Sequence, residues 1–215
     1  MSKKTIPLPP PPDPGIQLPL TYREIPDKWE PTNDWDSHRP LLYRVIMNTP
    51  HQYMYEFGIG EGSTPLLIDL YENVYPHAEY YSFENDWQWF ELFLNVKYQK
   101  NDNREHSYIS RNHCLTYTNH MPKWVVFKDS IVFIDNAPGE ERNSLLSKHA
   151  NYANVVIVHD TETGAEYVYH MADMLSKYKF RIDLVIEGMP QTTAVSNFFN
   201  FDAWRGIVND KYQFI

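Results

Sequence analysis

Short apolar runs alternate along the chain with longer segments whose apolar residues recur at helical spacing. Strands are expected at 53–57, 79–83, 106–110, 131–134 and 155–158. Helices are expected at 34–48, 63–71, 86–98, 140–150 and 165–177, the first of them capped by Asp36 or Ser37. The last two strand segments are apolar throughout, as in strands that are buried on both faces. This alternation predicts an α/β fold, a Rossmann-like three-layer sandwich around a mostly parallel sheet.

The two ends of the chain depart from this alternation. Residues 1–20 are dense in proline, which fixes φ and lacks a donor, so an extended arm is expected there. The arm could bind a proline-recognising partner, or it could lie on its own domain or on a second subunit and so support an oligomer; we favour the latter. The strand-like segments 181–187 and 192–199 are so close in sequence that only an antiparallel hairpin can join them. A last helix is expected at 201–208, and residues 21–215 are expected to form one domain.

The composition limits the kinds of partner that the protein can bind more than it limits the fold. The 215 residues carry a formal net charge of −9 and no run rich in Lys or Arg, which disfavours nucleic acid and suits a neutral or cationic small molecule. Cys114 is the single cysteine, so no internal disulfide can form and a reducing compartment is expected. The sequence shows no signal peptide and no apolar stretch that could span a bilayer. A cytoplasmic protein without a membrane partner is the expectation.

A glycine-rich loop follows the strand expected at 53–57. Gly58, Gly60 and Gly62 lie between this strand and a helix that Ser63 opens. Glycines allow a tight turn and a close approach of the backbone to a ligand, and a helix N-terminus presents free N–H groups. The loop holds three of only 8 glycines in the chain. That concentration favours a ligand site over a turn without a ligand.

Two details of the loop separate the candidate ligands. The last glycine of the dinucleotide pattern G-x-G-x-x-G would fall at Ser63, so that pattern is incomplete. Glu56 precedes the glycines, and a carboxylate there can attract an amino group and a sulfonium but would repel a pyrophosphate. Both details favour S-adenosylmethionine over a nicotinamide cofactor, and a methyltransferase over an NAD-dependent oxidoreductase.

The segment 56–62, with the sequence EFGIGEG, resembles the first motif of the class I S-adenosylmethionine-dependent methyltransferases, an acidic residue followed by G-x-G-x-G. As an order of elements the resemblance covers about residues 36–200. It implies that the methyl donor binds at Glu56, Gly58, Gly60, Gly62 and Ser63. The segments 135–142 and 159–162 look like those of subfamilies that act on sugars and other small hydroxylated substrates, which implies O-methylation.

A further donor contact is expected at the end of the strand at 79–83. Glu84 comes about 20 positions after the glycine loop, where an acidic residue at the next strand end can hydrogen-bond ribose hydroxyls. The same carboxylate could instead favour the N-terminus of the following helix, and both roles can hold at once. The resemblance assigns the ribose to Glu84. Trp87, which follows closely, is a candidate to flank the adenine.

Ionisable side chains follow the two continuously apolar strands. Asp135 comes after the first of them, and His159, Asp160 and Glu162 come at the end of the second. Ligands of open α/β sheets bind beyond the carboxyl ends of the strands, so these groups are expected to converge on the acceptor side. Asp135, His159 and Asp160 are the candidate catalytic residues, with His159 as a general base and Asp135 also close to the donor.

Other interpretations of these residues stay open. Asp135, Asp160 and Glu162 could hold Mg²⁺, as carboxylates do in some members of the family resembled, and lower the pKa of a substrate hydroxyl. Asp135 could instead cap a turn, and Asp160 the next helix. Arg142 could hold an acidic substrate group, but a surface ion pair with Glu166 or another carboxylate is favoured.

The sequence therefore predicts an S-adenosylmethionine-dependent O-methyltransferase for a small hydroxylated, sugar-like substrate. The competing hypothesis is a non-catalytic Rossmann-like binding module that is recruited through the proline-rich arm.

Overall fold

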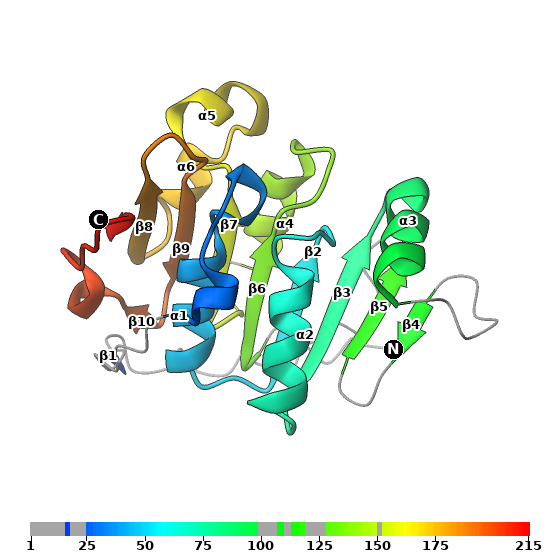
Figure 1. The fold of residues 1–215 in the computed structure, drawn as a ribbon. Coiled ribbons are helices and arrows are strands. Elements are labelled where there is room, and N and C mark those ends of the chain that lie inside the picture. The colour runs from blue at the N-terminus through cyan, green and yellow to red at the C-terminus, as the bar shows by residue number, and fades with distance from the viewer. Residues whose placement is uncertain (1–15, 18–24, 99–106, 110–112, 119–127, 150–151) are drawn as a thin grey trace, which may run out of the picture.

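The structure of the protein, a computed structural model, describes residues 16–17, 25–98, 107–109, 113–118, 128–149 and 152–215. Within these residues the fold is built on a nine-stranded sheet with the order β11-β8-β9-β7-β6-β2-β3-β5-β4 (Figure 1). Its central strands are parallel: β5 (His113–Tyr117), β3 (Glu79–Glu84), β2 (Tyr53–Phe57), β6 (Ser130–Ile134) and β7 (Val155–His159). The predicted Rossmann-like fold with a mostly parallel sheet is confirmed.

Antiparallel strands extend the sheet on both sides. β9 (Thr192–Ser196) pairs with β7, and β8 (Phe180–Ile186) pairs with β9, which confirms the predicted hairpin. β11 (Tyr212–Phe214), which the sequence did not predict, pairs with β8. On the other side β4 (Ser107–Ile109) runs antiparallel to β5. The segment expected as the third strand is therefore an edge strand, and β5 takes the place beside β3.

Helices cover both faces of the sheet (Figure 1). α1 (Arg39–Asn48) and α2 (Thr64–Asn73) share a buried cluster with Met54, Ile131 and Ile157. α4 (Glu141–His149) and α6 (Ala172–Leu175) share another with Tyr55 and Val132. Consecutive strand residues thus enter opposite cores, which is the period-two geometry of a strand buried on both faces. α3 (Trp87–Tyr98) packs through Phe90 and Phe93 in a third cluster.

Three expected helices differ from the structure. The segment at 34–48 begins with a 3₁₀ turn, η2 (Asp34–Asp36), and α1 starts only at Arg39, because the Asp36 side chain forms the capping box of η2 with Asn33 and does not cap α1. The segment at 165–177 is divided into α5 (Thr163–Tyr169) and α6, since His170 has a φ of +51°, a left-handed conformation that ends a helix. Only a 3₁₀ turn, η3 (Asp202–Trp204), forms at 201–208.

The proline-rich arm is described only at β1 (Ile16–Gln17), which pairs in parallel with β10 (Phe199–Asn200). The rest of residues 1–20 lies outside the described residues, so its expected roles stay predictions. Another 3₁₀ turn, η1 (Asp27–Trp29), precedes η2. No helix in the described part of the chain has both the length and the apolar character needed to cross a membrane.

Candidate functional site

The strand order reverses beside β2, at the centre of the sheet. From β2 the chain moves to β3 and β5 on one side, and it then crosses to β6 on the other side. Ligands of open α/β sheets bind in the crevice at such a point, beyond the carboxyl ends of the strands. The ends of β2 and β6 are in contact here, because the N–H of Asp135 donates to the carbonyl oxygen of Phe57 at 2.8 Å.

The three glycines between β2 and α2 have different surroundings. Gly58 has a φ of +92°, and a Cβ atom there would lie 2.4 Å from the carbonyl oxygen of Asp135. A Cβ atom on Gly62 would lie 1.9 Å from the carbonyl oxygen of Trp35, so this glycine is required for packing against η2. A Cβ atom on Gly60 would have its nearest neighbour, the nitrogen of Gly62, 4.0 Å away. Gly60 is therefore the glycine of this loop that faces open space.

Glu56 lies beneath the loop and has no exposed surface. Its carboxylate accepts hydrogen bonds from four hydroxyl groups, those of Ser63, Thr64, Tyr80 and Ser82. Burial raises the pKa of the Glu56 carboxyl to about 7, although the four hydroxyls oppose this shift. The place of Glu56 thus differs from the one expected: the carboxylate faces the start of α2 instead of the crevice, and it ties Ser63 and Thr64 to β2.

The residue Ile59 is held on both sides by groups at the start of α3. Its N–H donates to Oε2 of Glu84 at 3.1 Å, and its carbonyl oxygen accepts from Nε1 of Trp89 at 2.6 Å. The other carboxylate oxygen of Glu84 accepts from the N–H groups of Asn85 and Asp86 at 2.8 Å. Burial raises the pKa of the Glu84 carboxyl, against these N–H donors. Glu84 thus bonds the two residues before α3, whereas Asp86 caps the first turn of α3, because its Oδ1 accepts from the N–H of Trp89 at 3.0 Å. The ribose role of Glu84 stays a prediction.

Trp87, the expected adenine neighbour, packs against the apolar cluster that includes Ile59 of the glycine loop. Its ring lies edge-on to Tyr117, with centroids 5.1 Å apart, and it is partly buried. The tryptophan whose side chain hydrogen-bonds the glycine loop is Trp89, which sequence reasoning assigned to no site. A role for Trp87 at the adenine stays a prediction.

Arg39, the first residue of α1, fixes the end of the glycine loop. Its Nε donates to the carbonyl oxygen of Gly62 at 2.6 Å, and one terminal nitrogen donates to that of Glu61 at 2.9 Å. The other terminal nitrogen bonds the Asp36 carboxylate at 2.8 Å. Sequence reasoning missed Arg39, because its loop partners lie 22 and 23 residues further along and no local pattern marks them.

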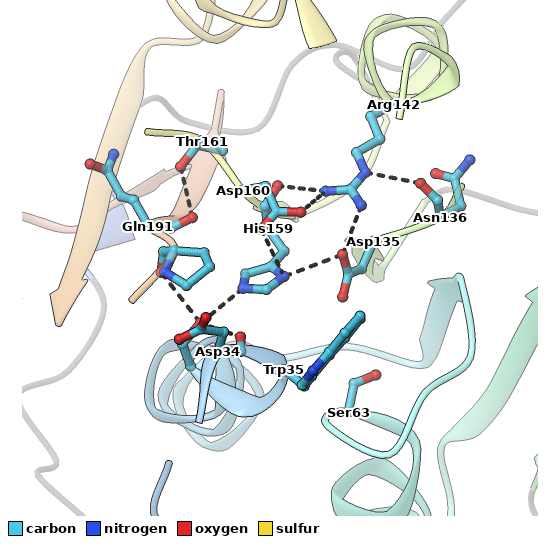
Figure 2. A network of polar contacts seen from close by, with 12 residues as sticks. Asp34, Trp35, Ser63, Asp135, Asn136, Arg142, His159, Asp160, Thr161 and Gln191 are labelled. Atoms are coloured by element: carbon cyan, nitrogen blue, oxygen red, sulfur yellow. Dashed lines mark hydrogen bonds and ion pairs between the residues drawn. The ribbon is translucent and has the colours of Figure 1, made fainter. Parts of the chain in front are cut away.

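A hydrogen-bonded chain crosses the ends of β6 and β7 (Figure 2). Nε2 of His159 lies 2.9 Å from the hydroxyl of Ser37, and Nδ1 lies 3.2 Å from Oδ1 of Asp135. The Ser37 hydroxyl also lies 3.1 Å from the carbonyl oxygen of Asp34 and 3.3 Å from that of Pro190. When its one proton goes to either carbonyl, the hydroxyl accepts from Nε2. Burial lowers the pKa of His159, but the carboxylates of Asp135 and Asp160 outweigh this effect and raise it overall.

Arg142 lies buried between the two aspartates, as Figure 2 shows. Its terminal nitrogens lie 3.0 Å from Oδ1 of Asp135 and 2.8 Å from Oδ2 of Asp160, and its Nε donates to the carbonyl oxygen of Asn136 at 3.0 Å. His159 and Arg142 hold the pKa of the Asp135 carboxyl below its ordinary value, although burial raises it. The expected surface pair of Arg142 with Glu166 is wrong, because the first turn of α4 points this side chain back at the strand ends.

The expected magnesium ligands do not share one site. Asp135 and Asp160 are bridged by Arg142, and the Glu162 carboxylate accepts from the N–H of Gln191 at 3.0 Å. These three carboxylates are thus engaged by a guanidinium and a backbone amide, and the expectation of Mg²⁺ on them stays a prediction. Within the described ranges, the group of side chains close enough to share an ion is a different one: His38, Asp135 and His159.

His38, which sequence reasoning also missed, lies between the sheet and His159. Its ring centroid is 4.8 Å from that of Phe133 and 4.8 Å from that of His159. Burial, and next the neighbouring His159, lower the pKa of His38 well below its ordinary value. No signal in the sequence marks this residue, because it follows a 3₁₀ turn that belongs to none of the recognised motifs.

A cavity of about 220 Å³ adjoins the end of β7, near α5 and α6. Asp160, Glu162 and Arg181 are among the residues that line it, and the glycine loop contributes none. The cavity is therefore separate from the open side of Gly60, and we do not assign the donor to it.

No family model and no curated protein matches the sequence. Among solved structures, precorrin-6y C5,15-methyltransferase from Geobacter metallireducens GS-15 is similar at 15% identity and a TM-score of 0.49, over 73% of this chain and 86% of that one. A chain of a Pnkp1/Rnl/Hen1 complex is similar at 10% identity and a TM-score of 0.46, over 77% of this chain and 42% of that one. A putative methyltransferase from Thermoplasma acidophilum is similar at 10% identity and a TM-score of 0.41, over 74% of this chain and 76% of that one. At such low similarity the function is argued from the geometry of the site alone.

Proposed function

We propose that the protein is an S-adenosylmethionine-dependent methyltransferase that methylates a hydroxyl group of a small, sugar-like acceptor. The observation that carries the proposal is the place of Gly60, which faces open space where the strand order reverses. The loop around it is held at Ile59 by Glu84 and at Gly62 by Arg39. A loop that is held on both sides of one open glycine is preorganised to receive a ligand with little further loss of freedom.

The chemistry around the loop favours a sulfonium over a pyrophosphate. Ser63 stands where the dinucleotide pattern needs its last glycine, and its buried hydroxyl is bonded to Glu56. Glu84 and Asp135 add carboxylates near the two ends of the crevice, in a chain of net charge −9. We assign the donor to the segment 58–63, with Glu84 at its ribose, Trp87 near its adenine and Asp135 near its methyl group.

The acceptor is assigned to the side of Asp135, whose side chain is 23% exposed, whereas that of His159 is only 6% exposed. In the proposed reaction the acceptor hydroxyl gives its proton to the Asp135–His159 pair and its oxygen bonds the methyl carbon. The carbon–sulfur bond breaks, and its electrons stay on the sulfur of S-adenosylhomocysteine. Asp160 acts on His159, whose Nδ1 lies 3.5 Å from its Oδ1, and also through Arg142, which orients Asp135. In-line placement of the two reactants supplies much of the rate.

Calorimetry with S-adenosylhomocysteine tests the donor site. Gly60→Arg fills the open side of the loop without a backbone clash, and Gly164→Arg in α5 is the matched control, because a Cβ atom there meets nothing within 4 Å. We expect wild type and Gly164→Arg to bind, and Gly60→Arg to lose binding while it keeps the thermal stability of wild type. The proposal fails if neither S-adenosylmethionine nor its product binds wild type at millimolar concentration, or if Gly60→Arg binds as wild type does.

Methyl transfer from labelled donor to a panel of monosaccharides, amines and thiols tests the acceptor class. We expect label in hydroxylated acceptors, with transfer lost in Asp135→Asn and His159→Asn. Transfer to amines or thiols alone would contradict O-methylation and leave the donor assignment standing.

A further inference from the structure

Three side chains from different elements converge beyond the carboxyl ends of β6 and β7. His38 lies just before α1, Asp135 follows β6, and His159 ends β7. One possible ligand atom from each lies within 4.8 Å of the other two. We propose that these three side chains bind one divalent transition-metal ion, a site formed by two imidazoles and one carboxylate.

His38 supplies the observation that points to a ligand. It is 1% exposed, and neither of its ring nitrogens makes a hydrogen bond of normal geometry to a described residue, although the backbone of Gly62 lies near the ring. A buried polar group without a partner costs about 1–3 kcal/mol, so such groups are rare without a ligand, an ion or a water. An ion between His38 and Asp135 would occupy one of these nitrogens.

His159 has the surroundings of a metal-bound histidine. Histidine ligands almost always donate their second ring nitrogen to a neighbouring acceptor, which fixes the tautomer. The Ser37 hydroxyl, 2.9 Å from Nε2, is that acceptor. Nδ1 is left to face Oδ1 of Asp135 at 3.2 Å. Adjacent ligands on an ion with bonds of about 2.1 Å lie about 3.0–3.4 Å apart, so this pair already has the required separation.

The 4.8 Å limit of the group exceeds the separation of about 3.4 Å between adjacent ligands by about 1.4 Å. Closing the site therefore requires side-chain rotation that moves a ligand atom by up to about 1.4 Å. The charges nearby also suit a cation. Asp135 and Asp160 bring two negative charges and the buried Arg142 brings one positive charge, so the sum is negative before an ion binds.

The ligand set selects the kind of ion. Imidazole suits Zn²⁺, Fe²⁺ and Co²⁺, whereas Mg²⁺ prefers oxygen ligands. Three protein ligands leave at least one coordination position free, as in catalytic metal sites. If the proposed function holds, on which this last step alone rests, that position receives the acceptor hydroxyl and the ion lowers the pKa of that hydroxyl. With the ion bound, water takes the proton in place of the Asp135–His159 pair.

Titration of the full-length, chelator-treated chain with Co²⁺, followed by visible absorption, tests the site. We expect one Co²⁺ per chain and its displacement by Zn²⁺. His38→Phe keeps an aromatic ring beside Phe133 but removes a ligand, and it should weaken Co²⁺ binding by more than about 100-fold, the upper range for loss of an outer partner. His77→Phe, at an exposed histidine, is the matched control and should bind as wild type does.

Two results would overturn the metal site: no Co²⁺ binding to wild type at micromolar concentration, or equal binding to wild type and His38→Phe. If thermal unfolding shows that His38→Phe does not fold, Asp135→Asn, which keeps the shape of the side chain, must show the loss instead. Calorimetry with S-adenosylhomocysteine on the same samples separates the two proposals. Co²⁺ binding that depends on His38 supports the metal site whether or not the donor product binds.

Discussion

The hydroxyl oxygen of Ser37 lies 2.9 Å from Nε2 of His159, although 122 residues separate them in the sequence. Ser37 is fully buried and also bonds the carbonyl oxygen of Asp34. The contact joins the segment before α1 to the end of β7, so the N-terminal part of the described chain is an integral part of the site.

Ser37→Ala removes this partner and leaves Nε2 of His159 buried without an acceptor. We expect the free energy of unfolding to fall by about 1–3 kcal/mol and Co²⁺ affinity to fall about 10–100-fold. Denaturant unfolding and the absorption titration measure the two effects. Ser147→Ala, whose hydroxyl donates to the carbonyl oxygen of Ser144 at an exposed position, should change neither. Equal stability of the two variants would contradict the role of Ser37.

The different surroundings of Gly62 and Gly60 predict different losses of stability when each is replaced by alanine. Gly62→Ala places a Cβ atom 1.9 Å from the carbonyl oxygen of Trp35, and we expect a loss of about 1–3 kcal/mol. Gly60→Ala has no such neighbour, and we expect stability to change by less than about 0.5 kcal/mol. Thermal unfolding of both variants is the measurement. A larger loss at Gly60 would show that the loop is packed differently.

Burial of Glu56 predicts a pH dependence of stability. The pKa of its carboxyl is about 7 in the folded chain against an ordinary value of 4.5, so the folded chain binds the extra proton between these values. The free energy of unfolding therefore falls as pH rises from about 4.5 to about 7, by at most about 1.4 kcal/mol per pH unit. Glu56→Gln should reduce this slope to the part that the Glu84 carboxyl contributes, since its pKa is also raised, and Glu79→Gln, at an exposed position, should keep the full slope. Denaturant unfolding across this range measures both, and parallel curves for wild type and Glu56→Gln would refute the prediction.

The bridge made by Arg142 predicts that its shape matters as well as its charge. Arg142→Lys keeps the positive charge but cannot reach Asp135 and Asp160 together, so we expect a loss of about 1.5–3 kcal/mol. Arg205→Lys, in an exposed pair with Asp202 at 3.3 Å, is the matched control, with an expected change below about 0.5 kcal/mol. Denaturant unfolding measures the free energy of unfolding of both variants. A similar small change in both variants would mean that the buried bridge adds nothing.

The strands β2, β3, β6 and β7 and the loop between β2 and α2 could be predicted from the sequence, because period-two burial, apolar runs and clustered glycines are local signals. The break at His170 could not, since a left-handed residue other than glycine leaves no clear local mark. The place of β5 also escaped prediction. Which segment pairs with β3 is decided by contacts between strands and by no property of either segment alone.

By itself the sequence determined the fold class, the glycine loop and the polar residues that end β6 and β7. Tertiary structure alone decided what these residues contact: it placed Glu56 beneath the loop, put Arg142 between two aspartates, and brought Arg39, Trp89 and His38 to the site. The physical reason is that backbone conformation and burial follow from nearest neighbours along the chain. Hydrogen-bond partners, pKa shifts and ligand groups depend on side chains that meet only when distant segments pack together.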